Sequence, residues 1–312
     1  MKLPQDIEAF VVANLAASKG DACRLFHGRG RTVAGWEQVS IDYFYPLILL
    51  TLFEEVDSDW LQDLTLSLQG WAEPYGIEAV AMQSRGSSAS ELQVLWGELP
   101  RKPVALERGL QFALQLEQRQ NVGFFLDMAQ ARHWISENSN DKRVLNLFAY
   151  TCAFSLVARS AGAAKVVNLD MSSAALRLGQ QNHQRNGIVG GVSYLAHNLF
   201  RSWSKLRRAG PFDLLIVDPP SRQPGSFVVE KDYARVIRKL PELCAPGAEL
   251  LLCLNSPHLE SSYLMDMVQE CAPQLEYVEL LPNPVQFADT NPELSLKVLR
   301  FRYSDLPDKD NT

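Results

Sequence analysis

The sequence predicts an α/β protein, with a doubly wound parallel sheet in its C-terminal part and a small α+β domain before it. The prediction rests on a regular alternation from Lys142 onward, in which short apolar runs of strand length precede longer segments of helical periodicity. Three of the apolar runs end in a sharp turn or a carboxylate, at 144–148, 166–170 and 214–218. Parallel strands end at one edge of a sheet, and open α/β sheets bind ligands at that edge.

We expect three parts in the chain of 312 residues. Residues 1–120 should form the small α+β domain and bind the substrate. Residues 121–304 should form the sheet domain, and residues 305–312 a flexible tail.

The composition is that of an ordinary globular protein, with 46% hydrophobic and 21% charged residues. No apolar run approaches the roughly 18 residues of a membrane span, and the N-terminus does not resemble a secretory signal. Five cysteines without a CxxC pair argue against a disulfide framework and a zinc site, so we expect a cytoplasmic protein without metal. Residues 1–120 carry 10 basic and 16 acidic side chains, and the remainder carries 20 of each, so RNA contacts would need local basic patches.

The N-terminal domain should begin with an amphipathic helix over residues 4–19. The paired glycines in Cys23–Arg31 predict a hairpin. Ser58-Asp59 should cap a helix that runs from Trp60 to Trp71. Alternation over 77–83 predicts a strand, and Glu107-Arg108-Gly109-Leu110 a tight hairpin turn.

The C-terminal domain should contain five parallel strands and a terminal hairpin. The expected strands are 143–148, 165–169, 192–195, 212–217, 249–254, 275–281 and 296–302. The expected helices are 130–138, 153–161, 172–186, 199–208, 231–244 and 261–271. Ser172 should cap the helix that Asn186-Gly187 ends, and Pro246-Gly247 should form the turn before the fifth strand.

Asp170 is the first candidate for ligand binding, because a carboxylate at the end of the second strand can accept both hydroxyls of a ribose. The alternative is that it caps the following helix. The turn after the first strand has Tyr150-Thr151-Cys152 where a dinucleotide fold has glycines, which leaves little room for a pyrophosphate. A cofactor without phosphate, such as S-adenosylmethionine, suits this turn, with backbone groups near Phe148 and Ala149 at its methionine end. The Asn198 amide could pair with an adenine edge or cap the next helix.

The sharpest motif is Asp218-Pro219-Pro220-Ser221, at the end of the fourth strand. The prolines fix φ and stiffen the turn. The Asp218 carboxylate and the backbone carbonyls can then accept hydrogen bonds from an amino or ring N–H of a planar substrate. Methyl transfer needs mainly such orientation of the reactants. The alternative is a purely structural turn.

Several of these segments together resemble bacterial large-subunit ribosomal RNA methyltransferases, namely 123–127, 145–151, 170–172, 182–187 and 218–220. The similarity is to the class I group that makes 5-methylcytosine and to its relative that makes 7-methylguanine, and it implies a Rossmann-like class I methyltransferase sheet. It implies ribosomal RNA as the substrate and S-adenosylmethionine as the cofactor. The N-terminal RNA-binding PUA module of many such proteins is expected to be absent, since about 22 residues precede Cys23. The resemblance implies cofactor contacts at Asp127, Phe148, Tyr150, Thr151, Asp170, Asn198 and Asp218. We expect Ala149, Met171 and Leu199, which adjoin these residues, to contribute as well.

The sequence also departs from that family. Cys152 stands where the family has glycine, Ala129 where it has arginine, and Asn198 where it has an acidic residue. The cytosine-methylating relatives carry Ser-Cys-Ser after strand five, whereas this chain has Asn255 there. Cytosine C5 becomes nucleophilic only after a thiolate adds to C6, and Cys253 should be a buried core residue.

We therefore assign the catalytic roles to Asp218, Pro219, Pro220 and Asn255 and favour methylation of a purine nitrogen over cytosine C5. Two basic clusters could contact RNA, Arg24-Arg29-Arg31 and Arg201-Lys205-Arg207-Arg208. Trp36, Tyr43 and Tyr45 could stack on a flipped base, although core packing is the simpler expectation. The alternative functions are a methyltransferase for a small molecule or a protein, and a degenerate paralogue that binds RNA or ribosomes without catalysis.

Overall fold

The computed structural model describes residues 5–85, 92–117, 121–223 and 226–304. The chain forms two compact units. The first comprises Met1–Leu126 and Pro284–Pro292, and the second comprises Asp127–Asn283 and Glu293–Thr312. The expected boundary at Gln120 and the expected tail 305–312 both lie outside the described residues.

The segment Pro284–Pro292 was not expected in the first unit. The ring of its Phe287 lies 5.2 Å from the ring of His27, and the backbone N–H of Thr290 donates to Gly30 O at 2.9 Å. Contacts between segments so far apart in the chain leave no local signal in the sequence.

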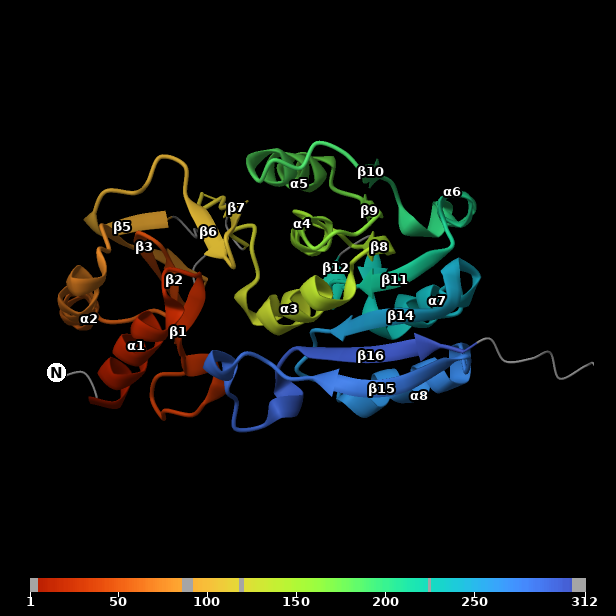
Figure 1. Ribbon diagram of the computed structural model, residues 1–312. Helices are drawn as coiled ribbons and strands as arrows, with labels where there is room; N and C mark the ends of the chain where they lie inside the picture. The colour runs from red at the N-terminus through yellow and green to blue at the C-terminus, as the bar shows by residue number, and fades with distance from the viewer. Residues whose placement is uncertain (1–4, 86–91, 118–120, 224–225, 305–312) are drawn as a thin grey trace, which may run out of the picture. The chain divides into compact units, whose positions relative to one another are not determined.

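The first unit is built around a five-stranded sheet with the order β1-β2-β3-β4-β5 (Figure 1). Its elements are α1 (Gln5–Ser18), β1 (Cys23–His27), β2 (Val39–Phe44), β3 (Leu47–Leu52), α2 (Ser58–Ala72), β4 (Ala79–Ser84), β5 (Leu92–Gly97), β6 (Val104–Glu107) and β7 (Leu110–Ala113). Strands β3 and β4 are parallel, and the other neighbours in this sheet are antiparallel. Apolar residues of α1 and α2 pack with one face of the sheet into a single core.

The prediction of the residue that caps the N-terminus of α2 is wrong by one position. Asp57, not Ser58 or Asp59, caps this helix: its Oδ1 accepts hydrogen bonds from the N–H groups of Asp59 and Trp60, at 2.9 and 3.2 Å. The expected hairpin turn at 107–110 joins β6 to β7, and Arg108 and Gly109 both adopt positive φ there.

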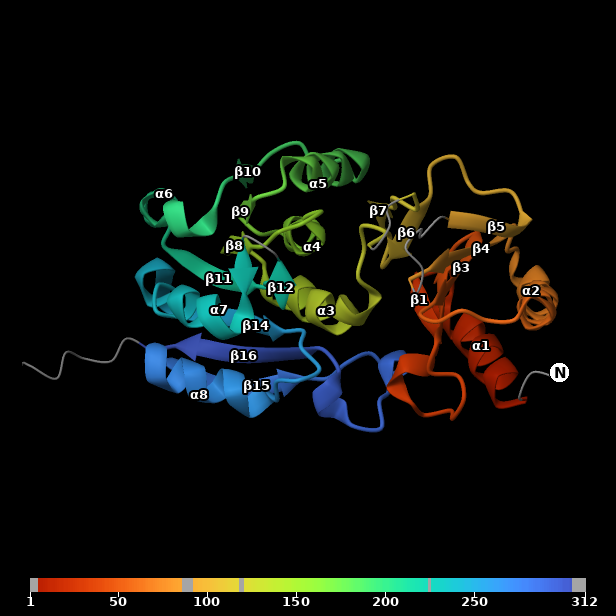
Figure 2. The ribbon, with the colours of Figure 1, turned by 180° about the vertical axis from the view of Figure 1, so that it is seen from behind.

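The second unit contains a seven-stranded sheet with the order β10-β9-β8-β11-β14-β16-β15 (Figure 2). Its elements are α3 (Ala129–Asn138), β8 (Arg143–Leu147), α4 (Ala153–Ser160), β9 (Lys165–Asp170), α5 (Ser173–Arg185), β10 (Val192–Ala196), α6 (Trp203–Ala209), β11 (Phe212–Val217), β12 (Arg222–Gln223), β13 (Phe227–Val228), α7 (Val229–Ile237), β14 (Cys244–Leu254), α8 (Ser261–Cys271), β15 (Leu275–Leu281) and β16 (Lys297–Tyr303). The first five strands in that order are parallel, and β16 and β15 are antiparallel to their neighbours. The predicted doubly wound sheet is confirmed.

Helices α6, α7 and α8 supply the apolar residues that pack on one face of this sheet. None of the helices among the described residues combines the length and the apolar character that crossing a bilayer requires.

Two expected helices are shorter in the structure. The expected helix 199–208 is a 3₁₀ turn over Leu199–Arg201 followed by α6. The expected helix 231–244 ends at Ile237, and β14 begins already at Cys244. A register shift against β11 accommodates the Pro246-Gly247 turn within β14, which periodicity alone does not reveal.

Candidate active site

The turn between β8 and α4 has an unusual backbone. Phe148, Tyr150 and Cys152 adopt positive φ angles of 56°, 46° and 61°. Such angles are strained for residues with a Cβ, at roughly 1–3 kcal/mol each, and in most proteins they are left to glycine. The turn therefore has the backbone path of a glycine-rich loop without its glycines, and strain of this kind concentrates at functional sites.

Asp170, the last residue of β9, holds this turn in place. Its Oδ2 accepts the Tyr150 backbone N–H at 2.8 Å and its Oδ1 accepts the Ser172 N–H at 2.7 Å. A carboxylate has about four lone-pair positions, so both oxygens retain capacity for hydroxyl groups. The cap of α5 is Ser172, as predicted, with its Oγ 3.1 Å from the Ala175 nitrogen.

A buried polar network lies behind the turn and was not expected. Asn146 on β8 donates to Asn168 on β9 at 2.9 Å, and Asn168 donates to the Ser155 hydroxyl on α4 at 2.9 Å. His183 Nδ1 lies 2.7 Å from Gly179 O, which can only accept, so its Nε2 accepts from Ser155 Oγ at 3.1 Å. Burial lowers the pKa of His183, so the ring is neutral. Its Nδ1–H therefore donates to Gly179 O, and its Nε2 accepts from the Ser155 hydroxyl.

Asn198, Met171 and Leu199 lie at the ends of β10 and β9. Asn198 Oδ1 accepts the Phe200 N–H at 2.9 Å, so this residue caps the following 3₁₀ turn, as the alternative interpretation held. Its Nδ2 lies 3.9 Å from the sulfur of Met171, which is half exposed. Leu199 is buried in the core.

The Asp218-Pro219-Pro220-Ser221 corner follows β11 and is fixed against the loop after β14. The Ser221 hydroxyl donates to the backbone carbonyl of Asn255. From the other side, the ammonium group of buried Lys297 donates to Ser256 O at 2.8 Å. The Asn255 side chain is exposed, and none of the described residues hydrogen-bonds to its amide.

Asp218 is the residue of this corner whose pKa is shifted by its surroundings. Burial, and after it the negative charge of Asp127, raise its pKa, and a hydrogen bond from the Cys253 thiol opposes them, so that the pKa of Asp218 lies at about 7. The pKa of Cys253 is raised well above its usual value by burial and by the charges of Asp218 and Asp127, so this thiol stays protonated.

Tyr233 on α7 supports the corner from behind. It is fully buried, and its hydroxyl lies 3.0 Å from Cys253 O and 3.4 Å from Val217 O. The Tyr233 hydroxyl thus lies between backbone carbonyls at the C-terminal ends of β11 and β14. The rings of Phe148, Phe227 and Tyr233 follow one another at centroid distances of 5.1 and 6.2 Å, which links the corner to the turn after β8.

These groups lie at one edge of one sheet. Only β8 separates β9 from β11, so the strand ends that carry Asp170 and Asp218 are about 10 Å apart. Asp127 precedes α3, and its charge acts on Asp218 and Cys253. Thr151 and Ala149 are buried within the turn itself.

The family model described as S-adenosylmethionine-dependent methyltransferase matches residues 23–302. The chain belongs to this family. The ribosomal RNA large subunit methyltransferase I of Aeromonas salmonicida is 30% identical over 199 residues, which are 62% of this chain and 50% of that protein. The ribosomal RNA large subunit methyltransferase K/L of Shewanella amazonensis is 30% identical over 203 residues, 64% of this chain and 28% of that protein. The chain thus spans about half the length of the first relative and less of the second.

Solved structures show the same fold. A putative methyltransferase from Streptococcus mutans superposes with a TM-score of 0.83 at 23% identity, over 97% of this chain and 83% of that one. The M. jannaschii tRNA m1G37 methyltransferase superposes with a TM-score of 0.64 at 16% identity, over 89% and 78%.

The residues at the sheet edge of the methyltransferase fit its cofactor. Asp170 keeps free acceptor capacity for ribose hydroxyls. The turn at 148–152 has positive φ angles at Phe148, Tyr150 and Cys152, as a glycine-rich loop would have. Among the residues that the structure describes, no His, Cys, Asp and Glu side chains form a group suited to a metal ion.

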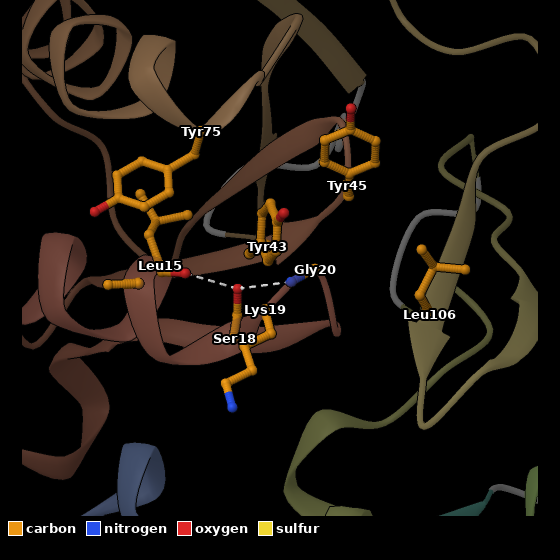
Figure 3. A pocket seen from close by; sticks show the side chains of 9 residues that line it. Leu15, Ser18, Lys19, Gly20, Tyr43, Tyr45, Tyr75 and Leu106 are labelled. Carbon is orange, nitrogen blue, oxygen red and sulfur yellow. Dashed lines mark hydrogen bonds between the residues drawn. The ribbon is translucent and has the colours of Figure 1, made fainter.

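The methyltransferase also has a hollow in its first unit, with a volume of about 430 Å³ (Figure 3). It is lined by Leu15, Ala16, Ser18, Lys19, Gly20, Tyr43, Tyr45, Tyr75 and Leu106. All of these belong to the first unit, so the hollow is distinct from the cofactor edge. Trp36 and Tyr43 are buried in the core, as the simpler expectation held, while Tyr45 is 43% exposed.

Proposed function

We propose that this methyltransferase modifies a base of ribosomal RNA, and that the acceptor is a purine nitrogen rather than cytosine C5. The observation that carries the choice of atom is the pair Cys253 and Asn255. Cys253 is 1% exposed and hydrogen-bonded to Asp218, and Asn255 is the exposed residue after β14. Methylation at C5 needs a thiolate that can reach the base, and this thiol is both buried and protonated.

A nitrogen acceptor needs no covalent partner, and the corner supplies what it does need. When bound, S-adenosylmethionine provides an electrophilic methyl group. Asp218 accepts a hydrogen bond from an N–H of the base and orients the nitrogen lone pair. The nitrogen would form its new bond to the methyl carbon as the sulfur–carbon bond of the cofactor breaks and leaves S-adenosylhomocysteine. An exocyclic amino group then loses a proton, which Asp218 takes. A pKa near 7 lets Asp218 pass that proton to water afterwards.

The remaining proposed roles follow from position. Pro219 and Pro220 keep the Asp218 carboxylate at a fixed angle, and the Asn255 amide offers a donor and an acceptor to the base. The other cofactor contacts that we propose follow the ends of β8, β9 and β10, except for Asp127, which precedes α3; they are Asp127, Phe148, Ala149, Tyr150, Thr151, Met171, Asn198 and Leu199. If the substrate is ribosomal RNA, the enzyme would act in the cytoplasm.

The support for RNA comes from the curated relatives, whose names state ribosomal RNA as the substrate. The departure at Cys152 does not favour a degenerate paralogue, because its backbone takes the φ that glycine would take. The acidic excess of residues 1–120 keeps a protein or small molecule as the second candidate substrate.

Transfer of tritium from labelled S-adenosylmethionine distinguishes these substrates. The acceptors are ribosomal RNA from a strain that lacks the gene and a protein extract from the same strain. We expect label in RNA, and nucleoside analysis should find it on a methylated purine. Label confined to protein or to small molecules would reject the RNA substrate. Label in 5-methylcytosine would reject the nitrogen acceptor alone.

A further inference from the structure

Three strands of the first unit end at one edge of its sheet. Strand β2 is antiparallel to β1 and to β3, and β3 is parallel to β4, so β1, β3 and β4 run in one direction. Arg29, Phe53 and Arg85 follow the ends of these three strands, and we call them the arginine edge. The backbone N–H of Arg85 donates to Leu52 O at 2.7 Å, which fixes the ends of β3 and β4 against each other.

The side chains of the arginine edge are stacked. The guanidinium carbons of Arg29 and Arg85 lie 4.6 and 5.7 Å from the centroid of the Phe53 ring. Stacking on an aromatic face holds a guanidinium in place without using its N–H groups. Both arginines are exposed, and Arg29 makes no ion pair with the described residues.

The turn that carries Arg29 is preformed. A Cβ at Gly28 would lie 1.8 Å from Trp36 O, and a Cβ at Gly30 would lie 2.0 Å from Ala288 O. Only glycine allows these backbone approaches, so both neighbours of Arg29 are clamped and the arginine is presented from a rigid turn. Gly28 and Gly30 thus fix the backbone on both sides of Arg29, whose side chain is exposed.

Both signs of charge occur near the arginine edge. Asp42, whose charge acts on Arg85, is paired with Arg24, and the exposed Glu54 and Glu55 follow Phe53 in the chain. Burial, with the positive charges of Arg24 and Arg29, lowers the pKa of His27 to about 3, so His27 is neutral and adds no charge. Arg85 is exposed as a residue, but its guanidinium group is partly shielded from water, which lowers its pKa; Asp42 opposes this, and Arg29 and Arg24 add to it. Guanidinium groups held beside one aromatic ring present N–H donors that suit an anion such as a phosphate.

We propose that the arginine edge binds phosphate groups of the RNA backbone and so holds the substrate on the first unit. The proposal rests on the proposed function, because it takes RNA as the anion. The guanidinium groups supply charge and paired N–H donors that match phosphate oxygens. They would contribute affinity without reading the base sequence.

The test measures how the affinity for RNA depends on salt. Binding of a fluorescent single-stranded RNA oligonucleotide of mixed sequence is followed by anisotropy at several salt concentrations. Each lost contact with a single-strand phosphate should reduce the slope of log K against log salt by about 0.7, and the affinity about fivefold at 0.1 M salt. We expect this loss for Arg29→Gln and for Arg85→Gln, and about twice the slope change for the double variant.

Two controls make the result specific. Arg101→Gln removes an exposed arginine elsewhere in the same unit and should leave the slope unchanged. Arg29→Lys keeps the charge and should retain most of the slope. Thermal unfolding of each variant verifies that the unit still folds. An unchanged slope in the double variant, or an equal loss in Arg101→Gln, would overturn the proposal.

The salt-dependence experiment and the tritium-transfer experiment test the arginine edge and the proposed reaction separately. Tritium transfer into ribosomal RNA by the wild-type enzyme, together with an unchanged slope in the double variant, would reject the arginine edge alone. A reduced slope without any transfer into RNA would reject the proposed reaction and leave the arginine edge as an RNA-binding site.

Discussion

Cys152 and Gly179 face each other between the turn after β8 and helix α5. A Cβ built on Gly179 would lie 2.5 Å from Cys152 Sγ and 2.8 Å from its Cβ. Cys152 adopts a positive φ and is fully buried. The cysteine therefore occupies space that a glycine at 152 would leave empty, and the helix provides that space by having a glycine at 179.

This pairing predicts that Gly179→Ala destabilises the protein, because the new methyl group overlaps the thiol. Overpacking of a core costs about 1–3 kcal/mol, which outweighs the roughly 0.5–1 kcal/mol that alanine gains over glycine within a helix. In the background of Cys152→Gly, the same change should cost much less, because only the Thr151 carbonyl oxygen, 3.1 Å from the new Cβ, remains as a close contact. Urea denaturation of the four proteins measures the coupling. Additive effects of the two substitutions would contradict the steric pairing.

The role of Asp170 in cofactor binding predicts a specific loss of affinity. Asp170→Asn removes the charge and places N–H donors toward backbone N–H groups, so the turn loses a hydrogen bond and the ribose loses its acceptor. Charge-assisted hydrogen bonds are each worth about 1.5–3 kcal/mol, so the affinity for S-adenosylhomocysteine should fall at least about 10-fold. Isothermal titration calorimetry measures it.

A matched control exists on the same sheet. Asp213, near the start of β11, accepts the Arg143 backbone N–H at 2.8 Å. It lies at the opposite end of the strand from Asp218, so Asp213→Asn also loses a backbone hydrogen bond but should leave the affinity for the cofactor unchanged. Equal losses in both variants would mean that Asp170 acts only through stability.

The architecture of the second unit could be predicted because its signals are local. Each parallel strand is a short apolar run, and residues such as Ser172 and Asp170 stand at strand or helix ends that the pattern already marks. Side chains that follow neighbouring strands must meet at one edge, so Asp170 and Asp218 could be assigned to one site from the strand order alone.

Other features depend on contacts between distant segments and could not be predicted. The segment 284–292 packs in the first unit, and nothing in its own sequence indicates this. His183 showed no pattern that suggested a role, because its function in the polar network depends on Ser155 and Asn168 on other elements. The effect of Asp127 on Asp218 likewise depends on how α3 packs.

The effect of Asp127 on the pKa of Asp218 predicts how the activity depends on pH. If Asp218 must be ionised to accept the N–H of the base, kcat/KM should rise with pH through the pKa of about 7 that the structure gives this carboxyl group. Asp127→Asn removes a negative charge that disfavours ionisation of Asp218, so the rising limb should move to lower pH. The measured quantity is the pH at the midpoint of the rising part of the kcat/KM profile, which does not depend on the maximal rate. A limb that stays in place or moves to higher pH would exclude this coupling.

Cys253 provides the complementary test, since its thiol donates a hydrogen bond to Asp218 and thereby lowers the pKa of that carboxyl group. Cys253→Ala removes this donor, so the limb should move to higher pH, opposite to the shift expected for Asp127→Asn. Removal of the buried sulfur should cost about 1–2 kcal/mol of stability. Activity at pH values above the shifted limb should persist, because nitrogen methylation uses no thiolate. Loss of all activity at every pH, in a variant that still folds and still binds S-adenosylhomocysteine, would instead assign the nucleophile of a C5 reaction to Cys253.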